Sequence, residues 1–190
     1  MKLRMSKERL GAFMDAVIAI IMTILVLELK EPVTLDWNGF ILLLPHFFAY
    51  TLSFFWLGAM WVNNHMYYER VKFVNQNTVW SAMLMLFFAS LFPYITKLMA
   101  SNFENGFIQS LYGGLVLVIT AVTVLFYSKL NEVNREELKG QNVRDTKWMF
   151  WDVLIKIMGL IFSLTIFPPA ASLSIFITLC LLVIPNQFKE

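Results

Sequence analysis

Long apolar stretches, separated by short polar segments, run through the whole chain. Each approaches the roughly 20 residues that a helix needs to cross a bilayer, although the last is shorter. They cover residues 10–29, 39–66, 78–99, 107–130, 148–167 and 170–184. The pattern predicts an all-α integral membrane protein, with residues 1–190 forming one domain of six transmembrane helices.

Prolines mark several boundaries of these stretches, because proline lacks a backbone N–H and disfavours continued helix before it. Pro32 follows the first stretch, Pro168 and Pro169 follow the fifth, and Pro185 is expected to end the sixth. Pro45, near the start of the second stretch, predicts a kink. The first stretch has the basic start of a signal peptide, but no small-residue cleavage site follows it, so we expect it to be retained.

The composition supports this class of protein. Of the 190 residues, 58% are hydrophobic and only 15% are charged, and the mean hydropathy is +0.65. A soluble domain averages about 25% charged residues and cannot bury so much apolar surface at this size. The net charge of +2 gives no reason to expect a nucleic-acid partner. The expected surroundings are a lipid bilayer.

The distribution of basic residues predicts the orientation. With six spans both termini lie on one side, and twelve lysines and arginines fall on that side against two on the other. The cytoplasmic side carries the excess of such residues, so both termini are expected there. The twelve are Lys2, Arg4, Lys7, Arg9, Arg70, Lys72, Lys129, Arg135, Lys139, Arg144, Lys147 and Lys189, and the two are Lys30 and Lys97.

The first stretch carries an ordered stripe of side chains. At 100° per residue, six of them lie within about 40° of one line. They are Arg9, Phe13, Ala16, Ile20, Thr23 and Leu27, with Ile24 at the edge. The simplest interpretation of this spacing alone is a helix-packing face.

Asp15 is harder to explain by packing. It lies inside the apolar stretch, where a carboxylate costs several kcal/mol unless it faces protein or water. Arg9 lies about 120° around the helix from it, so a partner on another helix is expected. His65, which follows Trp61 and Asn64 at a comparable depth of the second stretch, is a candidate.

Two further features have competing interpretations. Asp152 and Lys156 are spaced as an i, i+4 pair. They either neutralise each other near the interface, with Lys156 snorkelling, or serve a subunit contact or an ion vestibule. Cys180 is the one cysteine, so it forms no intramolecular disulfide, and we expect a small core residue.

These residues carry a family resemblance. The segment Arg9-x-x-x-Phe13-Met14-Asp15, followed by Ala19-Ile20 and Thr23-Ile24-Leu25-Val26-Leu27, resembles the first-helix signature of the transmembrane protein 175 family. These proteins are lysosomal and prokaryotic potassium channels. Trp61 with Asn64-His65 resembles the pattern of their second helix. The family motif is Arg-x-x-x-Phe-Ser-Asp, so Met14 stands where the family has serine.

The resemblance implies a homotetramer in the plasma membrane of a prokaryote, with a central pore lined by the first helix. Ile20, Ile24 and Leu27 match the apolar constriction of the family, and Thr23 matches its hydroxyl layer. The inter-helix polar network would comprise Arg9, Phe13, Asp15, Trp61, Asn64 and His65. Potassium would be the permeant ion, with no other metal and no cofactor.

A mechanism follows from this resemblance. The chain has no TVGYG string, and its nearest fragment, Tyr112-Gly113-Gly114, is expected to serve close helix packing. Selectivity would then come from side chains of the first helix. The apolar neck would gate by narrowing or dewetting, and Thr23 hydroxyls would replace part of the hydration shell that potassium sheds more readily than sodium. The expected preference for potassium is modest.

The sequence also has to be weighed against other functional classes, namely transporters, enzymes and scaffold proteins. Asp15, His65 and Asp152 are the groups with which a proton- or ion-coupled secondary transporter would work. An enzyme is not expected, because HExxH and GxSxG motifs and paired intramembrane aspartates are absent from the sequence. A scaffold protein would show no ion flux at all. The acidic residues at the outer end of the first stretch either attract cations to a pore mouth or form a solvated loop; they are Glu28, Glu31 and Asp36.

Overall fold

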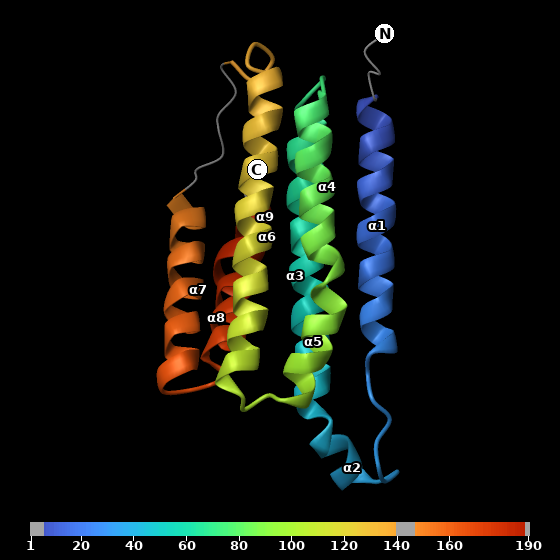
Figure 1. Ribbon diagram of the computed structural model, residues 1–190, viewed down its shortest axis with the longest axis vertical. Coiled ribbons are helices and arrows are strands. Elements are labelled where there is room, and N and C mark those ends of the chain that lie inside the picture. Colours follow the sequence, from blue (N-terminus) through green and yellow to red (C-terminus); the bar gives the residue numbers. More distant parts are fainter. Residues whose placement is uncertain (1–5, 140–146, 189–190) are drawn as a thin grey trace.

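The structure is a computed structural model that describes residues 6–139 and 147–188. Its long helices run up and down beside one another as a bundle (Figure 1). Helix α1 (Lys7–Leu27) lies at one edge and α7 (Lys147–Thr165) at the other. Four of the cations used to predict orientation lie outside the described residues, namely Lys2, Arg4, Arg144 and Lys189.

The second apolar stretch is divided near its start. Short helix α2 (Trp37–Leu42) and long helix α3 (Leu44–Glu69) meet at Leu43, and Pro45 lies in the first turn of α3. The kink predicted at Pro45 is therefore confirmed, as a full break. Proline is tolerated in a first helical turn because the N–H that it lacks has no partner there.

The third stretch also consists of two helices, which the sequence pattern did not predict. Helices α4 (Gln76–Ser90) and α5 (Phe92–Ser101) are separated by Leu91, with Pro93 in the first turn of α5. After them, α6 (Gly106–Val133) begins at Asn105, whose side chain accepts hydrogen bonds from two backbone N–H groups. Such a cap satisfies donors that the first turn leaves free.

The last stretch differs from its prediction. Helix α8 (Ala170–Thr178) continues into the π-helical segment η1 (Leu179–Val183) and then α9 (Ile184–Gln187), so the expected end at Pro185 is wrong. The wider π-helical turn precedes Pro185 and relieves the contact that its ring makes in a regular α-helix. Cys180 is exposed on η1, so its prediction as a core residue is also wrong.

Within the described residues, five segments are long and apolar enough to cross a membrane. They are α1, α4 with α5 (Gln76–Ser101), α6, most of α7 (Trp148–Thr165), and α8 through α9 (Ala170–Gln187). Helix α3 has 26 residues but is not among the five, and its last turns carry polar side chains. These apolar helices support a multi-pass membrane protein.

Aromatic and small side chains join the helices in the core. Trp56 of α3 stacks on Phe92 of α5 with 5.0 Å between ring centroids, and Tyr112 of α6 is fully buried. A Cβ added to Gly113 would lie 3.3 Å from the Cβ of Ala171, so α6 and α8 are close there. This agrees with the prediction that the Tyr112-Gly113-Gly114 fragment serves helix packing.

Candidate functional site

Helix α1 has two different faces. One face packs against α3, α4 and α5 and buries Leu10, Met14, Ile18, Ile21 and Leu25. The other face carries the predicted stripe, whose six members are all exposed, as is Ile24. The exposed fraction reaches 57% at Ile20 and 79% at Leu27. A single copy of the chain therefore leaves the stripe uncovered.

Thr23 is the one hydroxyl in this stripe. Its Oγ1 donates a hydrogen bond to the carbonyl oxygen of Ile20 over 2.8 Å. The hydroxyl hydrogen is thereby used within the helix, while the oxygen lone pairs keep their capacity to accept. Thr23 thus offers an oxygen on the exposed face between the apolar side chains of Ile20 and Leu27.

Asp15 has a partner on another helix, and that partner is Trp61. The Trp61 Nε1–H donates to Asp15 Oδ1 over 2.8 Å, joining α1 to α3. His65 stacks on the Trp61 ring, with 5.6 Å between centroids, and its Nε2 lies 4.0 Å from a carboxylate oxygen of Glu69. The structure thus brings Asp15, Trp61 and His65 into one row, with Trp61 between the other two.

Asn64 lies apart from this row. Its side chain is buried, accepts a hydrogen bond from Tyr127 Oη over 2.8 Å, and places its amide nitrogen 3.7 Å from Met85 Sδ. Asn64 therefore joins α3 to α6 and α4. On α1, Arg9 and Phe13 are exposed. Met14, which replaces the motif serine, is 4% exposed and packs in the core.

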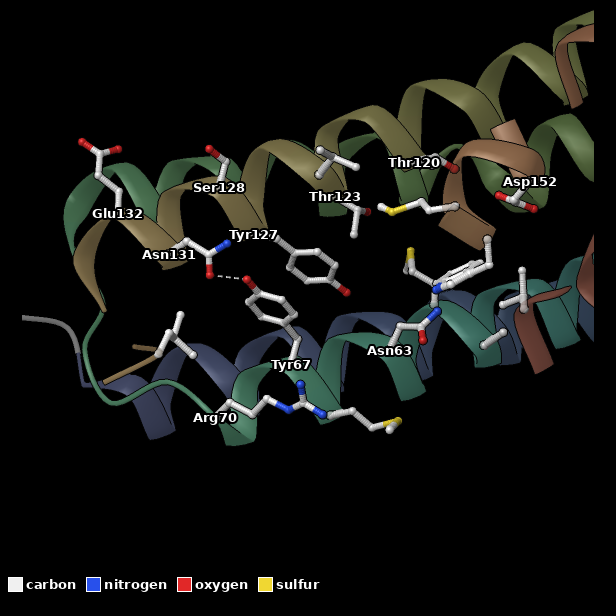
Figure 2. A pocket seen from close by; sticks show the side chains of 18 of the residues that line it. Asn63, Tyr67, Arg70, Thr120, Thr123, Tyr127, Ser128, Asn131, Glu132 and Asp152 are labelled. Atoms are coloured by element: carbon white, nitrogen blue, oxygen red, sulfur yellow. Dashed lines mark hydrogen bonds between the residues drawn. The ribbon is translucent and has the colours of Figure 1, made fainter. Parts of the chain in front are cut away.

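The sequence reasoning missed a second set of polar contacts, at the end of the bundle where α3 and α6 finish. The hydroxyl of Tyr67 donates to Asn131, and the Tyr67 ring stacks on Tyr127 with 4.1 Å between centroids (Figure 2). Buried Asn134 accepts from the backbone N–H groups of Lys72 and Phe73, each over 2.8 Å. Asn131 and Asn134, two asparagines near the end of one predicted helix, were the feature of the sequence that could have indicated these contacts.

Asp152 and Lys156 form a buried ion pair. Lys156 Nζ lies 2.7 Å from Asp152 Oδ2, and the two side chains are only 3% and 4% exposed. The expectation that Lys156 snorkels is therefore wrong, because its ammonium is held inside the chain by the carboxylate one turn away. The other carboxylate oxygen, Asp152 Oδ1, is buried and has no hydrogen-bond partner among the described residues.

The acidic residues after α1 have local partners. Glu28 lies 2.7 Å from Lys97 of α5. Asp36 caps α2 by accepting from the backbone N–H of Gly39 over 2.7 Å and from the Thr34 hydroxyl over 2.8 Å. These hydrogen bonds lower the pKa of Asp36 below its ordinary value, and the bond from Gly39 has the largest effect. Two of the three carboxylates thus serve local structure.

The chain is similar to several known proteins. Residues 9–93 match the family model described as the endosomal/lysosomal potassium channel TMEM175. A protein of Chryseobacterium sp. (strain P1-3) named as a potassium channel is 40% identical over 122 residues, which cover 64% of each chain. One from Streptomyces collinus, also named as a potassium channel, is 32% identical over 96 residues, covering 48% of this chain and 47% of its own. The matched parts thus span less than two thirds of these relatives.

The fold has a counterpart among solved structures. The crystal structure of a lysosomal potassium-selective channel TMEM175 homologue from Chamaesiphon minutus superimposes with a TM-score of 0.65 at 22% identity. The match covers 92% of this chain and 97% of that one. The family and these relatives are channels, which agrees with the prediction of a protein that is not an enzyme. Over residues 9–93 this chain is therefore similar to the TMEM175 family, and over most of its length it shares the fold of the Chamaesiphon minutus homologue.

Proposed function

We propose that this chain forms a potassium-permeable channel as a homotetramer, with α1 of each copy lining a central pore. The exposed face of α1 carries this proposal. Ile20, Thr23, Ile24 and Leu27 lie uncovered on it, while the opposite face is packed in the subunit. A single such helix per chain encloses a pore most simply through closed rotational symmetry. The relatives named as potassium channels support the choice of ion.

In this proposal the apolar side chains form the gate. Rings of Ile20, Ile24 and Leu27 would constrict the pore and exclude water when it narrows. Thr23 would supply one ring of oxygens between them, since its hydroxyl hydrogen is already donated to Ile20. Such a ring offers fewer fixed oxygens than a carbonyl filter, so the preference for potassium over sodium would be modest. Potassium is the permeant ion, and no further cofactor is proposed.

The proposed topology has six spans, with α3 as the second. Its polar end lies against α1 and α6, where Trp61 and Asn64 have hydrogen-bond partners, and this supports placing α3 among the membrane helices. The excess of lysine and arginine beside the ends of α1, α3 and α6 supports cytoplasmic termini. The membrane would be the plasma membrane of a prokaryote. The names of the relatives favour a channel over a coupled transporter.

The bi-ionic reversal potential of the purified protein in a planar bilayer tests this proposal. With potassium on one side and sodium on the other, we expect a reversal potential that favours potassium. Leu27→Ala should raise the leak current, because it widens the neck. Val26→Ala is the matched control: Val26 is 47% exposed but lies about 100° around the helix from Leu27. An absence of current, or equal effects of both variants, would refute the proposal.

A further inference from the structure

A cavity of about 950 Å³ lies between α3, α6 and α7. Figure 2 views it from close by, with Glu132 and Asn131 toward one end and Thr120 and Asp152 toward the other. None of its described lining residues belongs to α1, so it is separate from the proposed pore. Its volume is in the range of pockets that hold small molecules.

One end of this cavity carries uncompensated positive charge. Arg70 at the C-cap of α3 and Arg135 just after α6 both line it and are exposed. Glu132 also lines this end, but its carboxylate is already paired with Lys129 over 3.0 Å. Among the described residues, no carboxylate forms an ion pair with either arginine. An anion is therefore the complementary ligand for this end.

Between its two ends the cavity is elongated and mostly apolar, with Asn63, Thr123 and Tyr127 as polar side chains along it (Figure 2). Trp56, Met60 and Val124 are among the side chains that line it. Along α6 the lining extends from Glu132 to Thr120, which corresponds to about 18 Å of helix. A linear hydrocarbon chain fits such a passage better than a compact polar molecule does, because it buries apolar surface along the whole length.

The inner end is polar without carrying net charge. Asp152 and Lys156 both line it, and their ion pair leaves Asp152 Oδ1 without a hydrogen-bond partner in the part of the chain that the structure describes. A buried acceptor of this kind is normally satisfied by water. We therefore expect a hydrocarbon chain to occupy the middle of the cavity and to stop before this pair.

We propose that this cavity binds an anionic phospholipid, with its phosphate between Arg70 and Arg135 and one acyl chain along α6. Guanidinium groups match phosphate oxygens in a fork geometry, and basic pockets between membrane helices suit acidic lipid head groups. The arginines lie at the end of the bundle that we propose to be cytoplasmic. The site requires only that the chain is embedded in a membrane, so it stands independently of ion conduction.

Native mass spectrometry of the detergent-purified protein with added phosphatidylglycerol tests the proposal. The wild type should retain one lipid per subunit. The double variant Arg70→Gln/Arg135→Gln should weaken binding about tenfold or more, since each basic residue contributes to attracting the head group. Lys72→Gln is the matched control, because it removes one exposed charge beside Arg70 without lining the cavity. It should change binding less than about twofold.

A second variant tests whether the acyl chain occupies the cavity. Thr123 is half-buried and lines the middle, so Thr123→Phe should fill the passage and lower retention without changing any charge. Circular dichroism and elution volume will show that each variant is folded. The proposal is overturned if Lys72→Gln weakens binding as much as the arginine variants. It is equally overturned if Thr123→Phe binds like wild type, or if glycerol phosphate displaces the lipid at equal concentration.

Discussion

Two aspartates lie within apolar helices of this protein, and their surroundings are opposite. Asp15 of α1 is exposed and accepts a hydrogen bond from Trp61 of a neighbouring helix. Asp152 of α7 is buried and is paired with Lys156 of its own helix. From sequence alone both are intramembrane carboxylates that need a partner. The structure separates them into one at the open face of α1 and one deep inside the chain.

This difference indicates where function and where stability reside. The Asp152–Lys156 pair is buried within a single copy of the chain, so its removal should act on folding. Asp15 is exposed on α1 and is hydrogen-bonded to α3, so its removal should act on how α1 is held against α3.

Removing one partner of the buried pair should cost the most stability. Asp152→Leu leaves the Lys156 ammonium buried without a counter-charge, and such a loss costs about 3–5 kcal/mol. The double variant Asp152→Leu/Lys156→Met should recover most of this, because no charge then remains to be solvated. Reversible unfolding in mixed micelles measures both. If Asp152→Leu were as stable as the double variant, the claim that Lys156 is buried and needs Asp152 as its counter-charge would be contradicted.

Asn64 and His65 are adjacent residues of α3, and they offer a second comparison between a buried and an exposed polar side chain. Asn64 is buried and accepts a hydrogen bond from Tyr127, so Asn64→Leu should destabilise the protein by about 1–3 kcal/mol through the loss of that bond. His65 is exposed, and His65→Ala should change the free energy of unfolding by less than about 0.5 kcal/mol. The same unfolding assay checks both. If both variants lowered the free energy of unfolding equally, the exposure of His65 in the single chain would not describe its surroundings in the folded protein.

The Asp15–Trp61 hydrogen bond should contribute less. A double-mutant cycle with Asp15→Ala and Trp61→Phe is expected to give a coupling energy of about 1 kcal/mol, since the bond is charge-assisted but exposed in the single chain. Both single variants should also weaken chemical cross-linking between copies, because they loosen α1 from α3. Coupling near zero would show that Trp61 does not hold Asp15.

The smallest effect concerns the cap of α2. The pKa of Asp36 is lowered below 3.8, so its ionised form is stabilised in the folded chain. This stabilisation is present above that pH and is lost as the pH falls through the lowered pKa. Hydrogen exchange of a peptide covering α2, corrected for its intrinsic pH dependence, should show increased opening only in strong acid. Asp36→Asn should remove this pH dependence.

Much of the fold follows from the apolar pattern, because each predicted stretch corresponds to a helix or a run of helices. The errors arise where backbone geometry depends on neighbours. Pro93 breaks the third stretch, whereas Pro185 is accommodated after η1, and periodicity does not distinguish these two prolines. Among the proposed site residues, the pattern placed the α1 stripe on one face, and that face is exposed. Asn64 is buried whereas His65 is exposed. This difference depends on how α3 packs against its neighbours, and the hydropathy pattern does not contain that information.

The most direct test of the α1 assignment compares two cysteines on that helix. In a Cys180→Ser background, Thr23→Cys and Val26→Cys each place one thiol on exposed parts of α1. A charged, membrane-impermeant thiol reagent should reduce the potassium current of Thr23→Cys and leave that of Val26→Cys unchanged. If both currents resist the reagent, or if only the Val26→Cys current falls, the stripe from Ile20 to Leu27 does not line the ion pathway.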